Sequence, residues 1–405
     1  MNRNDRAIVG LVTLAHAMVH TFELSIPILM TEWLDAFPVT KATLGLVVGV
    51  GYALFGVGAL PGGVLADVVG SRRLIAACLA GMAASFLLLS ISPSVAFIAV
   101  ALVLWGVAAS VYHPSGLSLI SKGVTERGEG LAYHGIAGNL GIALGPLATT
   151  LLLLVFDWQT TTALLVLPAL AGAVFALRID IDETAAVEAT DGGTPRHDAV
   201  TSIPEFVAGT KRLFVGSFVF VFGVVIMSGL YYRGVLTFLP DVIAGFDAFA
   251  PTTAFGRTME PSRYVYVGLL TVGMAGQYVG GRLSDGVRPA RAIAATYGAL
   301  AALAVLFLPV ANVGPLPFLV LAGFLGFFLF LVQPVYQAAV AELTPVGTRG
   351  LSYGFVYFGT FGIGAIGGAL AGVLLTYADE WGLFLFLAAV ATVGSILGVA
   401  LLIRE

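Results

Sequence analysis

Twelve apolar stretches, each about as long as a membrane-spanning helix, constrain the fold of this chain more than any other feature. A spanning helix needs roughly 20 mainly apolar residues, and only helices or closed barrels satisfy every backbone polar group in lipid. The first six stretches are 8–30, 44–66, 74–91, 95–120, 130–156 and 160–177. The second six are 213–240, 264–281, 290–311, 315–341, 351–377 and 381–403. The sequence therefore predicts an all-α polytopic membrane protein with twelve transmembrane helices.

The composition agrees with this class, because 59% of the residues are hydrophobic and only 10% are charged, whereas soluble domains carry about 25% charged residues. The single cysteine, Cys78, excludes a disulfide framework. The net charge of −4 gives no indication of a nucleic-acid partner. The sequence has no glycine-rich phosphate loop followed by lysine, so we do not expect ATP to drive the process. We expect a monomer in the lipid bilayer, with no cofactor, no resident metal and no nucleic acid.

A polar stretch, residues 178–212, separates the two sets of apolar stretches and predicts a solvated linker with a short amphipathic helix near 204–207. The expected domains are an N-terminal six-helix bundle (1–177), this cytoplasmic linker (178–212) and a C-terminal six-helix bundle (213–405). With the N-terminus inside, most of the 19 lysines and arginines fall in loops on the cytoplasmic side, as the positive-inside rule requires. We therefore expect a multi-pass protein of the cytoplasmic membrane with both termini in the cytoplasm.

A charged, glycine-punctuated motif joins the second and third stretches. It is Gly63-x-Leu65-Ala66-Asp67-x-x-Gly70-x-Arg72-Arg73, and a weaker copy after the eighth stretch contains Gly281, Asp285 and Arg288. His113-Pro114 in the fourth stretch is likewise matched by Gln333-Pro334 in the tenth. Internal repeats of this kind in an apolar chain are typical of secondary transporters. The two halves are therefore predicted to be pseudo-symmetric bundles of six helices each.

These motifs, together with the twelve stretches and the central linker, resemble the major facilitator superfamily over nearly the whole chain. Two further segments, Tyr112-His113-Pro114-Ser115-Gly116 and the stretch from Tyr232 to Pro240, look like the fosmidomycin-resistance-like branch of drug:proton antiporters. Many proton-coupled relatives carry an arginine in the fourth span where this chain has Leu102. The resemblance implies alternating access, and export in exchange for protons.

The motif lies at the predicted membrane edge, where it favours a cytoplasmic gate. Asp67 is placed to accept hydrogen bonds from the first turn of the next helix and to pair with Arg72 or Arg73. Such contacts would close the inner gate and break when the site opens inward. The alternative is that these charges only anchor the helix ends.

Ionisable residues inside the predicted spans carry the hypothesis about mechanism, because a charge near the bilayer centre costs about 2.5–3.5 kcal/mol even on a lenient scale. His16, His20 and Glu23 occupy positions i, i+4 and i+7, so they share one face of the first helix. Three interpretations stay open for this face. They are a proton-coupling and substrate-binding stripe, a transition-metal site, and a set of hydrogen bonds between helices. His-x3-His spacing suits zinc, but no further ligand follows at motif spacing.

The seventh stretch is the repeat counterpart of the first and contains Arg233, the one arginine inside a span. An ionised arginine there needs a counter-charge. We expect Arg233 to pair with Glu23 when the site is empty, and protonation of Glu23 to free Arg233 for the substrate; the alternative is that Arg233 reaches outward along its span. Further cavity residues are expected beside the two prolines and next to Arg233. They are His113, Gln333, Tyr336 and Tyr232.

The sequence thus predicts a secondary transporter that most readily exports a small organic or drug-like solute in exchange for protons. One alternative is uptake of a small organic anion by proton symport, which Arg233 would serve equally well. An alternative from another class is an intramembrane metalloenzyme whose ligands are His16, His20 and Glu23. Against an enzyme, no serine, histidine and aspartate constellation indicates hydrolysis.

Overall fold

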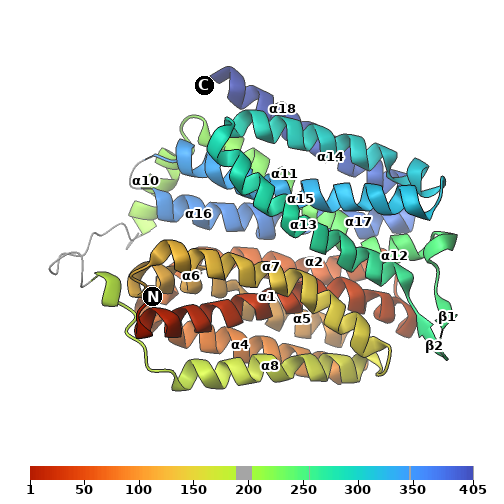
Figure 1. Ribbon diagram of the computed structural model, residues 1–405, viewed down its shortest axis with the longest axis horizontal. Coiled ribbons are helices and arrows are strands. Elements are labelled where there is room, and N and C mark those ends of the chain that lie inside the picture. Colours follow the sequence, from red (N-terminus) through yellow and green to blue (C-terminus); the bar gives the residue numbers. More distant parts are fainter. Residues whose placement is uncertain (188–202, 255, 346–347, 405) are drawn as a thin grey trace. The chain divides into compact units, whose positions relative to one another are not determined.

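The computed structural model describes residues 1–187, 203–254, 256–345 and 348–404. It is almost wholly helical, and each predicted apolar stretch coincides with one helix or with several consecutive ones (Figure 1). The helices of the first half are α1 Arg3–Ala36, α2 Lys41–Val57, α3 Ala59–Val69, α4 Ser71–Ser90, α5 Val95–Ser110, α6 Tyr112–Gly123, α7 Arg127–Leu153 and α8 Trp158–Arg178.

The second half begins with a short helix at the end of the predicted linker and continues with the remaining membrane helices. The elements are α10 Ile203–Leu213, α11 Phe218–Leu236, α12 Leu239–Ala244, the 3₁₀ turn η1 Asp247–Phe249, β1 Thr252–Ala254, β2 Arg257–Met259, α13 Pro261–Gly286, α14 Pro289–Ala311, α15 Pro315–Leu343, α16 Arg349–Tyr357, the π-helical turn η2 Phe358–Ile363, α17 Ala365–Tyr377 and α18 Glu380–Arg404. The amphipathic helix predicted near 204–207 is therefore longer than expected.

The predicted number of spans differs from the number of helices that are apolar enough to cross a membrane. Among the described residues ten helices qualify, and the bent pair α2 and α3, which turns by 48°, makes an eleventh. The remaining predicted span, the eighth along the chain, coincides with α13, whose 26 residues are long enough to cross but include Arg263, Gln277, Arg282 and Asp285. α13 differs from the ten qualifying helices in its more polar composition and not in its length.

Two of the predicted spans are interrupted for identifiable reasons. The fourth breaks at Val111 between α5 and α6, three residues before Pro114, which has no N–H to donate to the carbonyl of Ser110 one turn earlier. The eleventh contains the π-helical turn η2, at which a Cβ on Gly229 would lie 2.2 Å from the carbonyl oxygen of Thr360. The missing side chain thus lets α11 touch this turn backbone to backbone.

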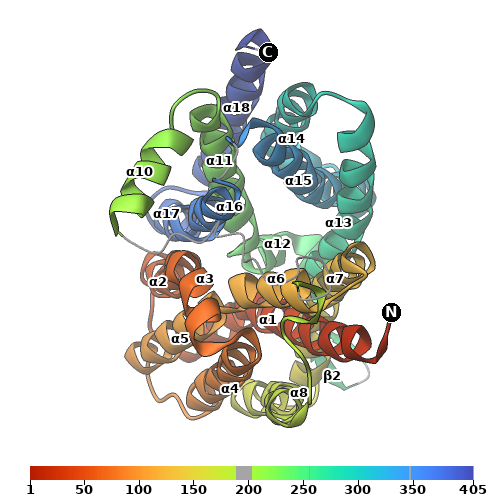
Figure 2. The ribbon, with the colours of Figure 1, turned by 90° about the vertical axis from the view of Figure 1, so that its left-hand side faces the viewer.

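The chain forms two compact units. Unit 1 comprises Met1–Ile26 and Val50–Ile203, and unit 2 comprises Pro27–Gly49 and Pro204–Glu405. Inside unit 1, α4 packs against both α5 and α8, and Figure 2 views these helices nearly end on. Inside unit 2, α13 packs on α15 and α14 packs on α18.

The residues around the α1–α2 loop belong to unit 2 because ion pairs and a hydrogen bond fix them there. Lys41 Nζ lies 2.6 Å from a carboxylate oxygen of Asp241 on α12. Arg263 Nη2 on α13 lies 2.5 Å from Glu32 Oε1 on α1. Thr376 Oγ1 accepts a hydrogen bond of 2.8 Å from the backbone N–H of Ala42. A division at the predicted linker assigns residues 27–49, the C-terminal end of α1 and the first part of α2, to the N-terminal bundle, whereas these residues belong to unit 2.

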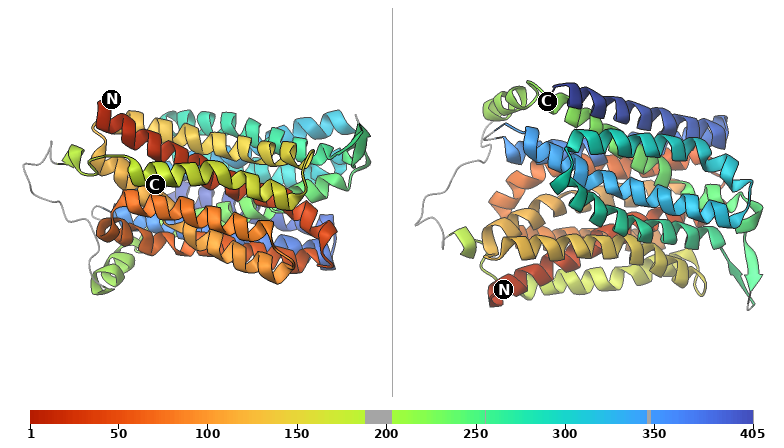
Figure 3. Two further views of the ribbon diagram at one scale, coloured as in Figure 1. Left: turned by 90° about the horizontal axis from the view of Figure 1, so that it is seen from below. Right: turned by 45° about the horizontal axis from the view of Figure 1, so that its top comes forward.

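A two-stranded antiparallel hairpin, β1–β2, precedes α13 and was not predicted. Thr252 pairs with Met259 and Thr253 with Thr258. The hairpin extends beyond the N-terminal end of α13 in both panels of Figure 3. It lies between the predicted seventh and eighth spans, where the sequence had indicated only a loop.

Candidate functional site

The polar face predicted on α1 forms a hydrogen-bonded chain in the interior of unit 1. His20 Nδ1 lies 2.6 Å from Glu23 Oε2, and its other ring nitrogen, Nε2, lies 3.1 Å from Nε2 of His16. His16 Nδ1 in turn lies 2.7 Å from the backbone carbonyl oxygen of His134 on α7. Glu23 is fully buried, and both histidines are less than 10% exposed.

The bonding partners determine how many protons this chain holds. The His134 carbonyl can only accept, so His16 Nδ1 carries a hydrogen, and each of the other two contacts also needs one hydrogen between its heavy atoms. Three hydrogens are therefore required, whereas a Glu23 carboxylate with two neutral imidazoles supplies two. If all three contacts are hydrogen bonds, the arrangement needs one hydrogen more than a Glu23 carboxylate and two neutral imidazoles supply.

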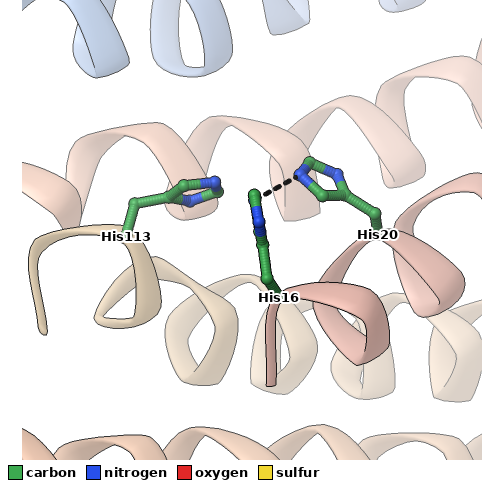
Figure 4. A group of neighbouring side chains, drawn as sticks. All are labelled: His16, His20 and His113. Atoms are coloured by element: carbon green, nitrogen blue, oxygen red, sulfur yellow. Dashed lines mark hydrogen bonds between the residues drawn. The ribbon is translucent and has the colours of Figure 1, made fainter. Parts of the chain in front are cut away.

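His113 joins the group from a different helix. It is buried at the start of α6, directly after the break that Pro114 causes. Its ring centroid lies 5.3 Å from that of His16 and 5.7 Å from that of His20, both in edge-on geometry. One ring nitrogen from each of the three histidines lies within 4.8 Å of the other two. Figure 4 shows the three rings directed at one another, with the His16–His20 contact dashed.

His134 and Tyr112 complete the surroundings, and sequence analysis had assigned neither to the site. The His134 ring stacks on His16 with centroids 3.8 Å apart. The Tyr112 hydroxyl donates to the backbone carbonyl of Val12 at 2.5 Å, which fixes its ring against His16. Both residues lie on other helices than α1, so no spacing in the sequence could have placed them there. The partners of the α1 face are thus α6 and α7.

Small residues on α7 make room for this arrangement. A Cβ on Gly138 would lie 2.4 Å from the His16 ring, one on Gly141 2.3 Å from the backbone oxygen of Ala17, and one on Gly145 2.5 Å from the Cα of Thr21. Helices α1 and α7 therefore meet backbone to backbone along this row. The glycines let the carbonyl of His134 reach His16.

The predicted residues of the second half lie in unit 2. Arg233 is 2% exposed on α11, and its guanidinium carbon lies 5.4 Å from the ring centroid of Tyr232 and 5.6 Å from that of Phe361 in η2. Tyr232 in turn meets Phe330 of α15 edge-on at 5.8 Å. Phe361 was missed because nothing in its local sequence separates it from the other phenylalanines of its span. The environment of Arg233 is thus aromatic.

The remaining two predicted cavity residues lie on α15. Tyr336 is buried and Gln333 is half-buried. The expected pairing of Glu23 with Arg233 would join residues of different units, and it stays a prediction. The structure thus gathers the N-terminal candidates into one cluster and places the C-terminal candidates in the other unit.

The motif at the α3–α4 junction makes other contacts than those expected. Asp67 forms an ion pair with Lys122 at the end of α6, and in the described part of the chain no ion pair joins it to Arg72 or Arg73. The first backbone N–H groups of α4 are capped by Glu183, whose Oε2 lies 2.8 Å from the N of Ser71. Arg72 donates from Nη1 to the carbonyl of Ile179 at 2.6 Å. Residues that follow α8 therefore hold this junction.

Gly70 forms the corner of this junction, and the weaker copy of the motif is not built in the same way. Gly70 has φ of 93°, a conformation that glycine adopts without strain. In the second copy, Asp285 and Arg288 are exposed, and within the described ranges neither forms an ion pair. The ion pair, the helix cap and the arginine contact described above therefore all belong to the first copy of the motif.

Comparisons with known proteins identify the class of protein. The family model described as Major Facilitator Superfamily matches residues 10–317, which is more than half of the chain. Curated protein sequences give no match. A solved crystal structure of a single-residue mutant of the nucleoside transporter NupG is similar with a TM-score of 0.74 and 13% sequence identity, covering 97% of this chain and 99% of that chain. At this identity the likeness shows the fold.

The family and the fold agree with the helical architecture and with the resemblance seen in the sequence. They point to a transporter and not to the alternative of an intramembrane metalloenzyme, and Glu23, one of the three ligands of that alternative, is hydrogen-bonded to His20. The finer resemblance to the fosmidomycin-resistance-like branch stays a prediction. The chain belongs to the Major Facilitator Superfamily and is a multi-pass membrane protein that carries out secondary transport of a small molecule.

Proposed function

We propose that this transporter exports a small organic or drug-like solute in exchange for protons. The observation that carries the proposal is the buried chain from Glu23 through His20 to His16, which needs one exchangeable proton to keep its three hydrogen bonds. A carboxylate and an imidazole in hydrogen-bond contact can pass a proton between them. This chain is therefore the coupling site of the proposed cycle.

Loss of the proton changes the energy of the arrangement. Without it, either the His16–His20 contact or the His20–Glu23 contact brings two lone pairs together at hydrogen-bonding distance. The deprotonated chain must then rearrange, or another group must take the place of the proton. A ligand drives a conformational change only if it has different affinities for the two conformations. The proton meets this requirement, because the conformation in which the chain forms its three hydrogen bonds binds it more tightly than the rearranged conformation.

The solute is proposed to meet the aromatic surroundings of Arg233, with Tyr232, Tyr336 and Gln333 as further contacts. A guanidinium that solute reaches during the transport cycle can donate hydrogen bonds to an anionic or strongly polar group, and Arg233 is the arginine proposed for this role. This same role supports the second candidate, uptake of an organic anion by proton symport. The Asp67–Lys122 ion pair is proposed to act in both cases as a gate on the cytoplasmic side, where both termini are also proposed to lie.

Transport in proteoliposomes decides between these functions. Purified protein is reconstituted with a pH-sensitive dye in the lumen, and drug-like cations, phosphonates, carboxylates and a nucleoside are added outside one at a time. An exchanger takes the solute in and releases protons, so the lumen becomes more alkaline, whereas a symporter makes it more acidic. An alkaline shift with one solute class supports the proposal. An acidic shift establishes the symport alternative, and the absence of a shift with every class contradicts proton coupling.

A further inference from the structure

We propose that His16, His20 and His113 form a binding site for one divalent transition-metal ion of the zinc class. The inference goes beyond the transport function and rests on the ligand geometry inside unit 1. Three imidazole nitrogens, all within 4.8 Å of one another, come from two helices and are buried. Imidazole is a ligand that Zn²⁺, Cu²⁺ and Ni²⁺ share, and three histidines with an open fourth position are a known zinc arrangement.

The ring nitrogens of two of these histidines already have the outer partners that metal sites use. A histidine that binds metal commonly donates its other ring N–H to a carboxylate or to a backbone carbonyl. His20 Nδ1 contacts the Glu23 carboxylate at 2.6 Å, and His16 Nδ1 contacts the His134 carbonyl at 2.7 Å. Both contacts leave Nε2 as the nitrogen of each ring that can bind an ion. The outer partners of the two rings are therefore in place before any ion arrives.

The distances require little movement. In a tetrahedral site with Zn–N bonds of about 2.0–2.1 Å, two nitrogen ligands lie about 3.3 Å apart. The Nε2 atoms of His16 and His20 are 3.1 Å apart, and His113 brings its nitrogen within 4.8 Å of both. An ion bound by both Nε2 atoms replaces the hydrogen that otherwise joins them and lies to one side of the line between the two nitrogens. The third imidazole then closes on it by a side-chain rotation of His113.

Neighbouring groups limit what else the site accepts. The carboxylate of Glu23 holds His20 from outside the group, so the ligand set consists of three neutral nitrogens. Hard cations such as Mg²⁺ and Ca²⁺ prefer oxygen ligands, and the three imidazoles of this set contain no oxygen. Cys78, the single cysteine of the chain, lies on α4 and is not part of the group. The donor set therefore selects a borderline transition-metal ion.

Direct binding to the full-length protein tests the site. Protein purified in detergent is stripped with chelator and titrated with Zn²⁺ by calorimetry, without any membrane gradient, so that the result is independent of proton-coupled transport. We expect one bound ion per chain, and affinity lower by at least about tenfold in His16→Gln and in His113→Gln. His197→Gln, which replaces the one histidine outside the described residues, is the control and should bind as the original chain does.

Two results would overturn the site. One is Zn²⁺ affinity that is the same in His113→Gln as in the unchanged chain, and the other is no binding that survives a weak competing chelator. Because a glutamine variant can fail to fold, the unchanged protein is also titrated with Co²⁺. Intense visible absorption of a four-coordinate nitrogen site supports the assignment, and the weak spectrum of hydrated Co²⁺ contradicts it.

Discussion

The Nε2 atoms of His16 and His20 face each other at 3.1 Å, so one of the two must carry a hydrogen and the other must accept it. His16 uses its other nitrogen to donate to a carbonyl, and His20 uses its other nitrogen toward Glu23. The protonation state of a carboxylate is thereby tied to the contact between two imidazoles. This connection underlies the first prediction.

Replacing Glu23 by glutamine is expected to uncouple transport from protons without unfolding the site. The glutamine amide can donate to His20 Nδ1, so all three hydrogen bonds are kept by neutral groups and the exchangeable proton is lost. Solute counterflow should persist, while accumulation driven by a pH gradient should fall to background. Both are measured in proteoliposomes. Asp35→Asn, at an exposed carboxylate near the end of the same helix, should change neither. Accumulation that persists in Glu23→Gln would show that this proton is not the coupling ion.

Gly138→Ala is expected to displace His16. The new Cβ would lie 2.4 Å from the His16 ring, and overpacking of this kind costs about 1–3 kcal/mol. Thermal unfolding in detergent should occur at lower temperature, and transport should be impaired. Gly135→Ala is the matched change three residues earlier on α7, where nothing lies within 4 Å of the added atom. That variant should keep transport and gain slightly in stability; equal behaviour of the two variants would contradict the packing argument.

The Asp67–Lys122 pair should matter for the transport rate more than for stability. Both side chains are more than 40% exposed, and exposed ion pairs contribute about 0.2–1 kcal/mol. Asp67→Asn and Lys122→Gln are therefore expected to unfold near the normal temperature while solute flux falls severalfold. Flux is measured in proteoliposomes, and Lys211→Gln, at an exposed position on α10, serves as the control. If flux is normal in both variants, the pair only anchors the helix ends.

Glu260, directly before α13, gives a prediction about pH. Burial raises the pKa of this carboxyl above its ordinary value of 4.5, Arg263 opposes the rise, and Glu32 and Asp35 add to it. The folded state therefore binds the proton more tightly than the unfolded state. Its contribution to stability is present below about pH 4.5 and is lost as the pH rises through the folded-state pKa. Glu260→Gln should raise the unfolding temperature at neutral pH and reduce its dependence on pH in the acid range.

Asp157 at the start of α8 provides the opposite case. A hydrogen bond from the backbone N–H of Thr160 lowers the pKa of the Asp157 carboxyl, so its stabilising effect is present at neutral pH and is lost in acid. Asp157→Ala should lower the unfolding temperature at neutral pH, with an expected cost of about 1 kcal/mol for loss of a helix cap. The same direction of change in both variants would contradict the assigned causes.

Sequence patterns predicted the elements well where the determining forces are local. The face shared by His16, His20 and Glu23 follows from the helical repeat alone, and every predicted span coincides with described helices. The partner of Asp67 was predicted wrongly, because Arg72 and Arg73 are close in the sequence while Lys122 is close only in the folded unit. The eighth predicted span coincides with α13, whose apolar residues are interrupted by glycines and by Arg263, Gln277, Arg282 and Asp285.

Length and periodicity therefore determined, from the sequence alone, that this chain spans a membrane as helices and that one face of its first helix is polar. Both properties depend on neighbouring residues of one segment and on the energy of burying them in lipid. Only the tertiary structure decided that His113 and the His134 carbonyl complete the group, because the approach of α6 and α7 depends on the break at Val111 and on the room left by Gly138. The contact of His16 with a backbone carbonyl of a different helix is set by packing between helices, which no single segment encodes.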